Sequence, residues 1–232
     1  MERDKRELLK KLAGLSLGAG FAVGGAGRLA VRVEEPEEDV APAEDLMREH
    51  GVLNRILLIY EFYERRLGDV KFDVDPGPLK ESVEIIRDFI ENYHEKLEED
   101  HLFPRFEKAK KLVELTTTLR AQHKAGRLLT ARLLGNGGPA GWRNPGDRSA
   151  GAGTLGEFIR MYRPHEARED TVLFPALRSI ISAHEYAALG EDFEDLEHKL
   201  FGKEGFEGVV VRVGELEKRI GIYELSQFTP KS

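Results

Sequence analysis

The sequence predicts an all-α protein in which four long helices form a bundle and shorter helices follow toward the C-terminal end. Three observations support this. Apolar residues recur every three to four positions in four long segments, which is the period of an amphipathic helix. Each of the four segments places one histidine within its apolar face. The second and fourth segments also share one motif, which indicates an internal repeat.

The first two long helices carry two of these histidines. The first helix is expected over residues 43–67, with His50 among its regularly spaced leucines. A connection rich in proline, glycine and aspartate leads to the second helix, over about residues 79–106 and beyond, which has His94 on its inner face. Proline lacks a backbone donor, so Pro104 is expected to bend this helix below His94.

The third helix is expected over residues 111–134, with His123 and Leu128 on its inner face. Residues 135–153 are rich in glycine and form a long connection before the next helix. A connection of this length is either functional or without fixed structure. We interpret it as a solvated crossover, and the alternative is a lid over a site.

The fourth helix is expected over residues 155–182 and carries His165. Its copy of the repeat has two additional residues before the histidine, one of which is Pro164. This excess predicts a kink or bulge at the histidine. Residues 183–232 are expected to form two shorter helices and a polar tail, which pack across the bundle.

The N-terminal segment has the features of an export signal. In residues 1–30, basic side chains precede an apolar run from Leu12 to Val23, and small residues follow. This run is shorter than the roughly 20 apolar residues that span a bilayer. The segment Asp4–Lys10 resembles a twin-arginine signal in which lysine replaces the first arginine, so we expect a periplasmic location. The alternative is a cytoplasmic amphipathic extension. Residues 31–42 are highly charged and are expected to be a linker.

The composition narrows the possible functions. The net charge of −7 argues against nucleic acid as the main partner, because phosphate binding requires a basic surface. The chain has no cysteine, which excludes disulfides, thiolate metal sites and cysteine nucleophiles. A metal site in this chain must therefore use His, Asp, Glu and water.

The repeated motif has the spacing of a metal site. Both copies read His-Glu-x-x-Glu-acid and reach Leu-Phe-Pro at the same distance from the histidine. A histidine and a glutamate four residues apart lie on one helix face, and imidazole with carboxylate suits iron, manganese or zinc. The four helices together offer four imidazoles and two carboxylates: His50, His94, Glu98, His123, His165 and Glu169. Two metal ions would stabilise such carboxylates in a bundle core. The alternative is that both glutamates face solvent.

On these residues, and over residues 43–182, the chain resembles hemerythrin-like proteins of the HHE cation-binding family. The resemblance implies an up-down four-helix bundle that holds a non-haem di-iron centre. It also implies that His50, His94 and Glu98 serve largely one iron. His123, His165 and Glu169 would serve largely the other, and the glutamates would be suited to bridging. Manganese or zinc would be possible with the same ligands.

The sequence departs from the family pattern at one position. Oxygen-carrying hemerythrins have a further histidine one turn from the third-helix histidine, whereas Leu119 and Arg127 lie there in this chain. The site is therefore expected to keep an open position for water or another small ligand. His101 is an alternative ligand, and Glu95 and Glu166 are either auxiliary ligands or outer hydrogen-bond acceptors.

The resemblance leaves three functions open. The first is a di-iron protein that binds, senses or carries dioxygen, nitric oxide or iron. The second is an enzyme that reduces peroxide or nitric oxide at the same centre. The third is a metal-free helical interaction module. Carrier and catalyst need the same ligands, so the sequence does not separate them.

The export signal predicts that mature protein from the native host begins between Arg28 and Glu38, because cleavage follows the small residues. N-terminal sequencing tests this prediction. An intact Met1 or Glu2 on cytoplasmic protein would contradict it.

Overall fold

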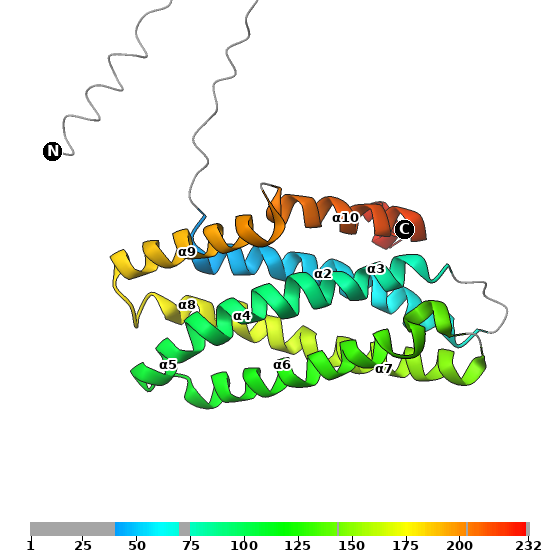
Figure 1. Cartoon of the computed structure of the whole chain (residues 1–232), viewed down its shortest axis with the longest axis horizontal. Helices are drawn as coiled ribbons and strands as arrows, with labels where there is room; N and C mark the ends of the chain where they lie inside the picture. Colours follow the sequence, from blue (N-terminus) through cyan, green and yellow to red (C-terminus); the bar gives the residue numbers. More distant parts are fainter. Residues whose placement is uncertain (1–39, 70–74, 143, 203, 231–232) are drawn as a thin grey trace, which may run out of the picture. The chain divides into compact units, whose positions relative to one another are not determined.

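The computed structural model describes residues 40–69, 75–142, 144–202 and 204–230, which form helices joined by short connections (Figure 1). This described part contains no strand, which confirms the all-α prediction. The predicted signal and nearly all of the predicted linker lie outside it. Within the described ranges, no helix is both long and apolar enough to cross a membrane.

The first and third long helices are regular. They are α2 (Pro42–Leu67) and α6 (Val113–Leu134), within two residues of the predicted bounds. Proline near the start of α2 and acidic residues in its first turn favour a helix N-terminus, and two arginines in its last turn favour the C-terminus. One inner-face prediction on α6 is wrong, because the Leu128 side chain is 67% exposed.

The second and fourth long helices each consist of several segments, including wider π-helical turns. The second runs through α3 (Gly77–Ile85), η1 (Ile86–His94), α4 (Glu95–Leu97), η2 (Glu98–Leu102) and α5 (Phe103–Ala109). The fourth runs through α7 (Pro145–Arg168), η4 (Glu169–Leu173) and α8 (Phe174–Leu177). The four long helices alternate in direction, which confirms an up-down bundle (Figure 1).

The Leu-Phe-Pro repeat produces the same π turn in both copies. The backbone N–H of Phe103 donates to the carbonyl of Glu98, and that of Phe174 donates to the carbonyl of Glu169. The next residue is a proline, which has no N–H and crowds the carbonyl four residues before it, so a wider turn accommodates it. The bulge expected at Pro164 is not found there, since α7 passes through this residue.

The fourth helix begins about ten residues before the predicted position. The Asn144 side chain accepts a hydrogen bond from the backbone N–H of Asp147, at 2.9 Å, and Pro145 starts the helix. These are helix-start signals within a stretch rich in glycine. Gly151 then allows the Trp142 ring to lie against the helix, because a Cβ there would lie about 2.5 Å from that ring.

The C-terminal helices pack against α2 on the side away from α6 (Figure 1). They are α9 (Ala183–Phe201) and α10 (Gly205–Ile220), and a short 3-10 helix, η5 (Leu225–Phe228), follows. Arg55 of α2 binds Glu217 of α10 through two hydrogen bonds, at 3.1 and 2.5 Å. The Ala43 backbone N–H donates to the hydroxyl of Tyr186 in α9, at 3.3 Å.

Two helical glycines predict opposite effects of alanine. A Cβ at Gly126 in α6 would overlap the Tyr162 hydroxyl of α7, whereas a Cβ at the exposed Gly51 in α2 would meet nothing within 4 Å. We expect Gly51→Ala to stabilise the protein by about 0.5–1 kcal/mol through helix propensity. Gly126→Ala should instead destabilise it by about 1–3 kcal/mol through overpacking. Thermal unfolding of both variants tests this, and a Gly126→Ala variant as stable as Gly51→Ala would contradict the close approach.

Candidate metal centre

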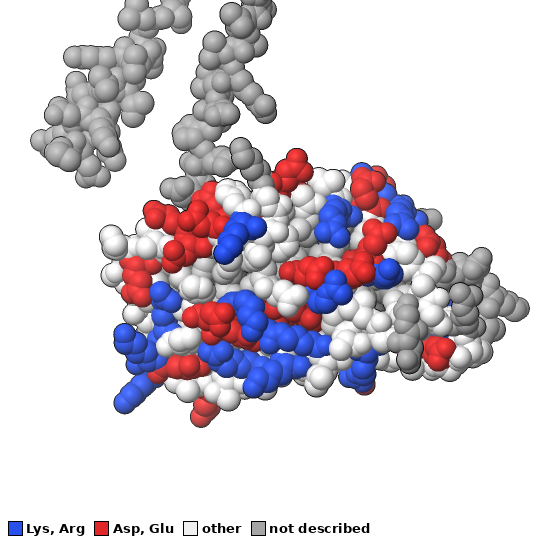
Figure 2. All heavy atoms as spheres, viewed as in Figure 1, with Lys and Arg blue, Asp and Glu red and all other residues white. Residues whose placement is uncertain are grey.

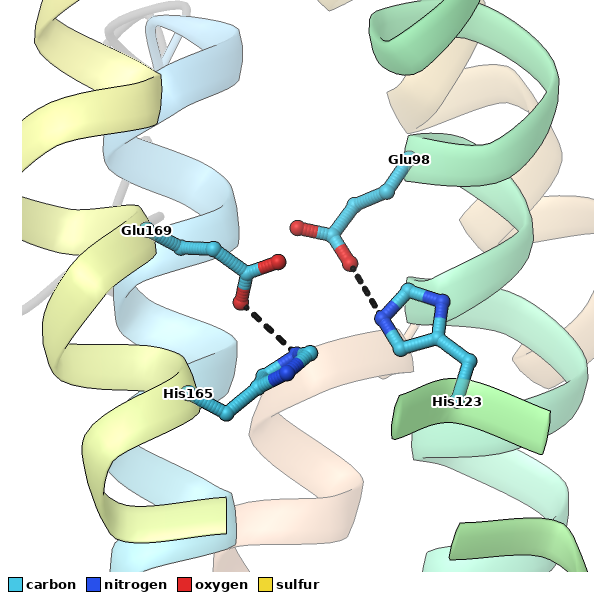
Figure 3. A group of neighbouring side chains, drawn as sticks. All are labelled: Glu98, His123, His165 and Glu169. Carbon is cyan, nitrogen blue, oxygen red and sulfur yellow. Dashed lines mark ion pairs between the residues drawn. The ribbon is translucent and has the colours of Figure 1, made fainter. Parts of the chain in front are cut away.

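The six residues singled out in the sequence lie together inside the bundle. Each of the four long helices contributes one histidine, and η2 and η4 contribute the two glutamates. Figure 3 shows Glu98 and His123 on one side and His165 and Glu169 on the other, with their polar ends directed toward one another. All six residues are buried, and none exposes more than 4% of its surface.

Ligand atoms of these residues fall into two overlapping groups. One atom each from Glu98, His123, His165 and Glu169 lie within 4.8 Å of one another, and so do one atom each from His50, His94 and Glu98. Glu98 belongs to both groups. The two groups differ slightly from the expected division into two sets of three, because one carboxylate serves both.

Each glutamate lies between imidazoles from different helices. Oε2 of Glu98 is 3.3 Å from Nε2 of His123 and 3.8 Å from Nε2 of His94. Oε2 of Glu169 is 3.1 Å from Nε2 of His165 and 3.5 Å from Nε2 of His50. Both carboxylates therefore reach histidines of both expected sets, which is the placement that bridging ligands require.

The two carboxylates lack hydrogen-bond donors. Glu98 and Glu169 are fully buried, and none of their four oxygens accepts a hydrogen bond within the described part of the chain. Burial raises the pKa of both, and for Glu98 the nearby Glu169 raises the pKa further. Burying carboxylates in this way is costly, and bound cations would relieve the cost. The donor set therefore fits metal ions.

Burial also keeps three of the imidazoles in the form that binds metal. Desolvation lowers the pKa of His50 and His94, and it lowers the pKa of His165 to about 4. A neutral imidazole offers a lone pair to a cation. The Nε2 atoms of His50 and His94 are 3.1 Å apart, which two protonated imidazoles would not tolerate.

The outward nitrogen of each histidine has a partner on a neighbouring helix. Nδ1 of His50 lies 2.7 Å from Asp170, and Nδ1 of His94 lies 2.5 Å from Glu49. In the second half of the bundle, these distances are 3.1 Å from His123 to Glu99 and 2.9 Å from His165 to Gln122. Such partners fix the ring orientation and direct Nε2 into the centre, as in metal sites with oriented histidine ligands.

Two of these partners contradict an expectation from helical geometry. Glu99 and Asp170 follow the candidate glutamates by one residue, and a regular helix would direct them away. The π turns that begin at Glu98 and Glu169 change the local winding, and both acids contact histidines of adjacent helices. Burial tends to raise the Glu99 pKa, but hydrogen bonds from His123 and two cationic side chains hold it below its ordinary value.

The phenylalanines of the repeat cover two of the imidazoles. The Phe103 ring stacks on His123 with centroids 5.5 Å apart, and the Phe174 ring stacks on His50 with centroids 5.4 Å apart. Both phenylalanines are at most 1% exposed. They place apolar surface over the histidines and limit the access of water.

Glu95 and Glu166 both accept hydrogen bonds in this structure, and Glu95 also forms a group of possible ligands with Glu99 and His123. Glu95 accepts a hydrogen bond from the Tyr162 hydroxyl at 2.7 Å and pairs with Arg127 at 2.7 Å. Glu166 accepts from Asn54 at 3.0 Å. Burial raises the pKa of each to about 8. Arg127, which lies one turn after His123, binds two carboxylates, since it also contacts Glu99.

The remaining candidates lie outside the centre. The His101 ring packs edge-on against Phe193 of α9, with centroids 5.7 Å apart, and belongs to none of the described groups of possible ligands. Tyr93 directs its hydroxyl to Glu197 of α9, at 3.4 Å. The other two histidines, His184 and His198, are exposed. Glu49 and Gln122 were missed, although each directly precedes a candidate histidine in its helix.

Comparisons with known proteins agree with this geometry. The family model of the hemerythrin HHE cation binding domain matches residues 41–177. The uncharacterized protein Rv1995 of Mycobacterium tuberculosis (strain H37Rv) and the uncharacterized protein Mb2018 of Mycobacterium bovis are each 52% identical over 197 residues, covering 84% of this chain and 76% of the relative. No solved structure matches the chain. With a family match over more than half of its residues and the histidines and glutamates gathered in one core, the chain belongs to the hemerythrin HHE cation-binding domain family.

Proposed function

We propose that the chain holds a non-haem di-iron centre and uses it to bind dioxygen or nitric oxide, as a sensor or carrier. The observation that carries the proposal is the pair of fully buried carboxylates, Glu98 and Glu169, whose four oxygens accept no hydrogen bond from the described residues. Four imidazoles direct nitrogen atoms to the same space. Two divalent cations would balance both carboxylates.

The four histidines and two glutamates offer iron a mixed set of nitrogen and oxygen ligands. In the proposal, His50 and His94 serve largely one ion, His123 and His165 the other, and the two glutamates lie between them. Bound iron would supply the coordination position and the electrons that dioxygen or nitric oxide needs. Manganese or zinc would accept the same ligands, since nitrogen and oxygen donors discriminate weakly among these metals.

Arg127 supports an open position at the second ion. The residues one turn before and one turn after His123, where the family's further imidazole is expected, are Leu119 and Arg127, and the Arg127 guanidinium is held by Glu95 and Glu99 at 2.7 and 2.8 Å. A guanidinium is always protonated and offers no lone pair to a metal. The centre therefore has one fewer protein ligand, which favours the binding of a small exogenous molecule.

The Tyr162 hydroxyl, on a ring whose centroid lies 5.4 Å from that of His165, is a poor source of protons for reduction. Reduction of peroxide or nitric oxide consumes protons, which a nearby acid must deliver. The proton of the Tyr162 hydroxyl is donated to Glu95, and burial raises the pKa of this hydroxyl well above its usual value. Tyr162 is therefore a poor proton donor toward the centre. Turnover of peroxide or nitric oxide would favour the enzyme alternative.

Metal content and an optical spectrum test the function directly. Protein prepared with iron should retain about two iron ions per chain, one for each half of the ligand set. Its spectrum should change when dioxygen or nitric oxide is added to the reduced protein, and removal of the gas should reverse the change. Protein that retains no iron would contradict the di-iron centre. Iron-loaded protein with no spectral response would contradict the binding of dioxygen or nitric oxide but not the di-iron centre.

Carboxylate variants separate ligands from outer partners. Glu98→Ala and Glu169→Ala should lower the number of bound iron ions, because each removes a charge that the cations require. Glu99→Ala and Asp170→Ala should keep two ions at saturation but weaken affinity about 10–100-fold, because they only orient histidines.

Glu191→Ala, at an exposed position in α9, is the matched control. Iron titration measures stoichiometry and affinity together. Two tightly bound ions in both Glu98→Ala and Glu169→Ala would overturn the carboxylate assignment. Loss of an ion in Asp170→Ala but not in Glu169→Ala would shift the ligand by one residue.

A further inference from the structure

A second group of carboxylates lies between α2 and α9, outside the six residues of the metal centre. It comprises Asp45 and Glu49 of α2 and Glu197 of α9. One oxygen from each of the three lies within 4.8 Å of the others. Asp45 and Glu197 are partly exposed and Glu49 is fully buried, so the group connects the surface with the core.

Glu49 carries an oxygen that accepts no hydrogen bond in the described chain, although the Tyr93 hydroxyl, which donates to Glu197 at 3.4 Å, lies nearby. Its Oε2 accepts a hydrogen bond from Nδ1 of His94 at 2.5 Å, whereas its Oε1 has no hydrogen-bond partner. A fully buried carboxylate oxygen without a donor is costly. An acidic cluster alone would not indicate a ligand, but a buried carboxylate of the cluster that keeps one oxygen without a hydrogen bond does.

Positive charge near the group is insufficient to neutralise it. Arg48 lies 3.6 Å from Asp45, but the same guanidinium binds Glu207 at 3.0 Å and lies over the Phe206 ring at 4.3 Å. Glu194 and Glu207 add further negative charge near Asp45. Figure 2 shows acidic side chains gathered over α9. Burial, and next Glu197, raise the Asp45 pKa to about 6.

Glu197 is held in place independently of any cation. One of its oxygens accepts from the Phe206 backbone N–H at 2.9 Å, and the other accepts from the Tyr93 hydroxyl at 3.4 Å. Gly205 allows this approach, because a Cβ there would overlap the carboxylate. Capping of α10 explains the position of Glu197 but leaves Glu49 Oε1 unsatisfied. The Glu197 carboxylate is thus held in position before any ligand binds.

We propose that Asp45, Glu49 and Glu197 form a separate site for a hard divalent cation such as Ca²⁺, Mn²⁺ or Mg²⁺. Three carboxylates with water completing the shell are the ligands that such cations prefer. The site contains no imidazole, which distinguishes it from the centre. It gives the C-terminal extension a role, because α9 supplies one ligand. The site does not depend on the proposed function, although Glu49 links it to His94.

Terbium luminescence tests the site in the full chain. Tb³⁺ is a hard, oxygen-seeking probe that emits when a nearby tyrosine is excited, and the Tyr93 hydroxyl contacts Glu197. We expect saturable emission that Ca²⁺ reverses. Asp45→Asn and Glu197→Gln should each weaken Tb³⁺ binding about ten-fold or more, equivalent to one lost charge-assisted contact. Tyr93→Phe should reduce the emission while keeping all three carboxylates.

Glu194→Gln is the matched control, since it removes a neighbouring charge of the same helix without removing a ligand. Its affinity for Tb³⁺ should remain close to that of the unmodified chain. If Glu194→Gln and Glu197→Gln weakened Tb³⁺ binding equally, the binding would depend only on diffuse surface charge, and the proposed site would be overturned. Unchanged affinity in both Asp45→Asn and Glu197→Gln would do the same. Iron plays no part in this assay, so its result is separate from the iron titration.

Discussion

The structure depends on the removal of two carboxylates from water in the middle of a helical bundle. Glu98 and Glu169 have no exposed surface and accept no hydrogen bond from the part of the chain that the structure describes, so the fold carries a large electrostatic cost at its centre. Four imidazoles surround these carboxylates, and each imidazole is oriented by a partner on another helix. Cation binding and bundle stability are therefore expected to be coupled, because the same contacts serve both.

The two halves of the bundle use the same arrangement with different residues. His50 and His123 lie on the first and third helices, which lack the repeated motif, and are called the lone-helix histidines. The residue before each of them, Glu49 or Gln122, orients the histidine of the next helix. The residue four positions after each lone-helix histidine, Asn54 or Arg127, binds the glutamate that follows the repeat histidine. The carboxylate partner of His94 and the amide partner of His165 give the two halves of the ligand set unequal electrostatic surroundings, although their geometry is similar.

Helical periodicity was sufficient to predict the long helices and the six inward residues, because regular turns fix which side chains share a face. It failed where the winding changes. The π turns bring Glu99 and Asp170 to histidines that a regular helix would not let them reach. The early start of α7 depends on the cap at Asn144, a local signal within a glycine-rich stretch. The contacts of α9 and α10 depend on side chains distant in sequence, which periodicity does not relate.

The stacking of Phe103 on His123 and of Phe174 on His50 joins the halves in a reciprocal way. Each half supplies the phenylalanine that covers the other half's lone histidine, so neither half is complete alone. A chain of half this length would form two equivalent stacking contacts by pairing with a second copy around a two-fold axis. The bundle thus has the organisation of a homodimer whose subunits are fused through residues 110–112. At this junction, Lys110 and Leu112 both adopt positive φ angles, at a cost of about 1–3 kcal/mol each.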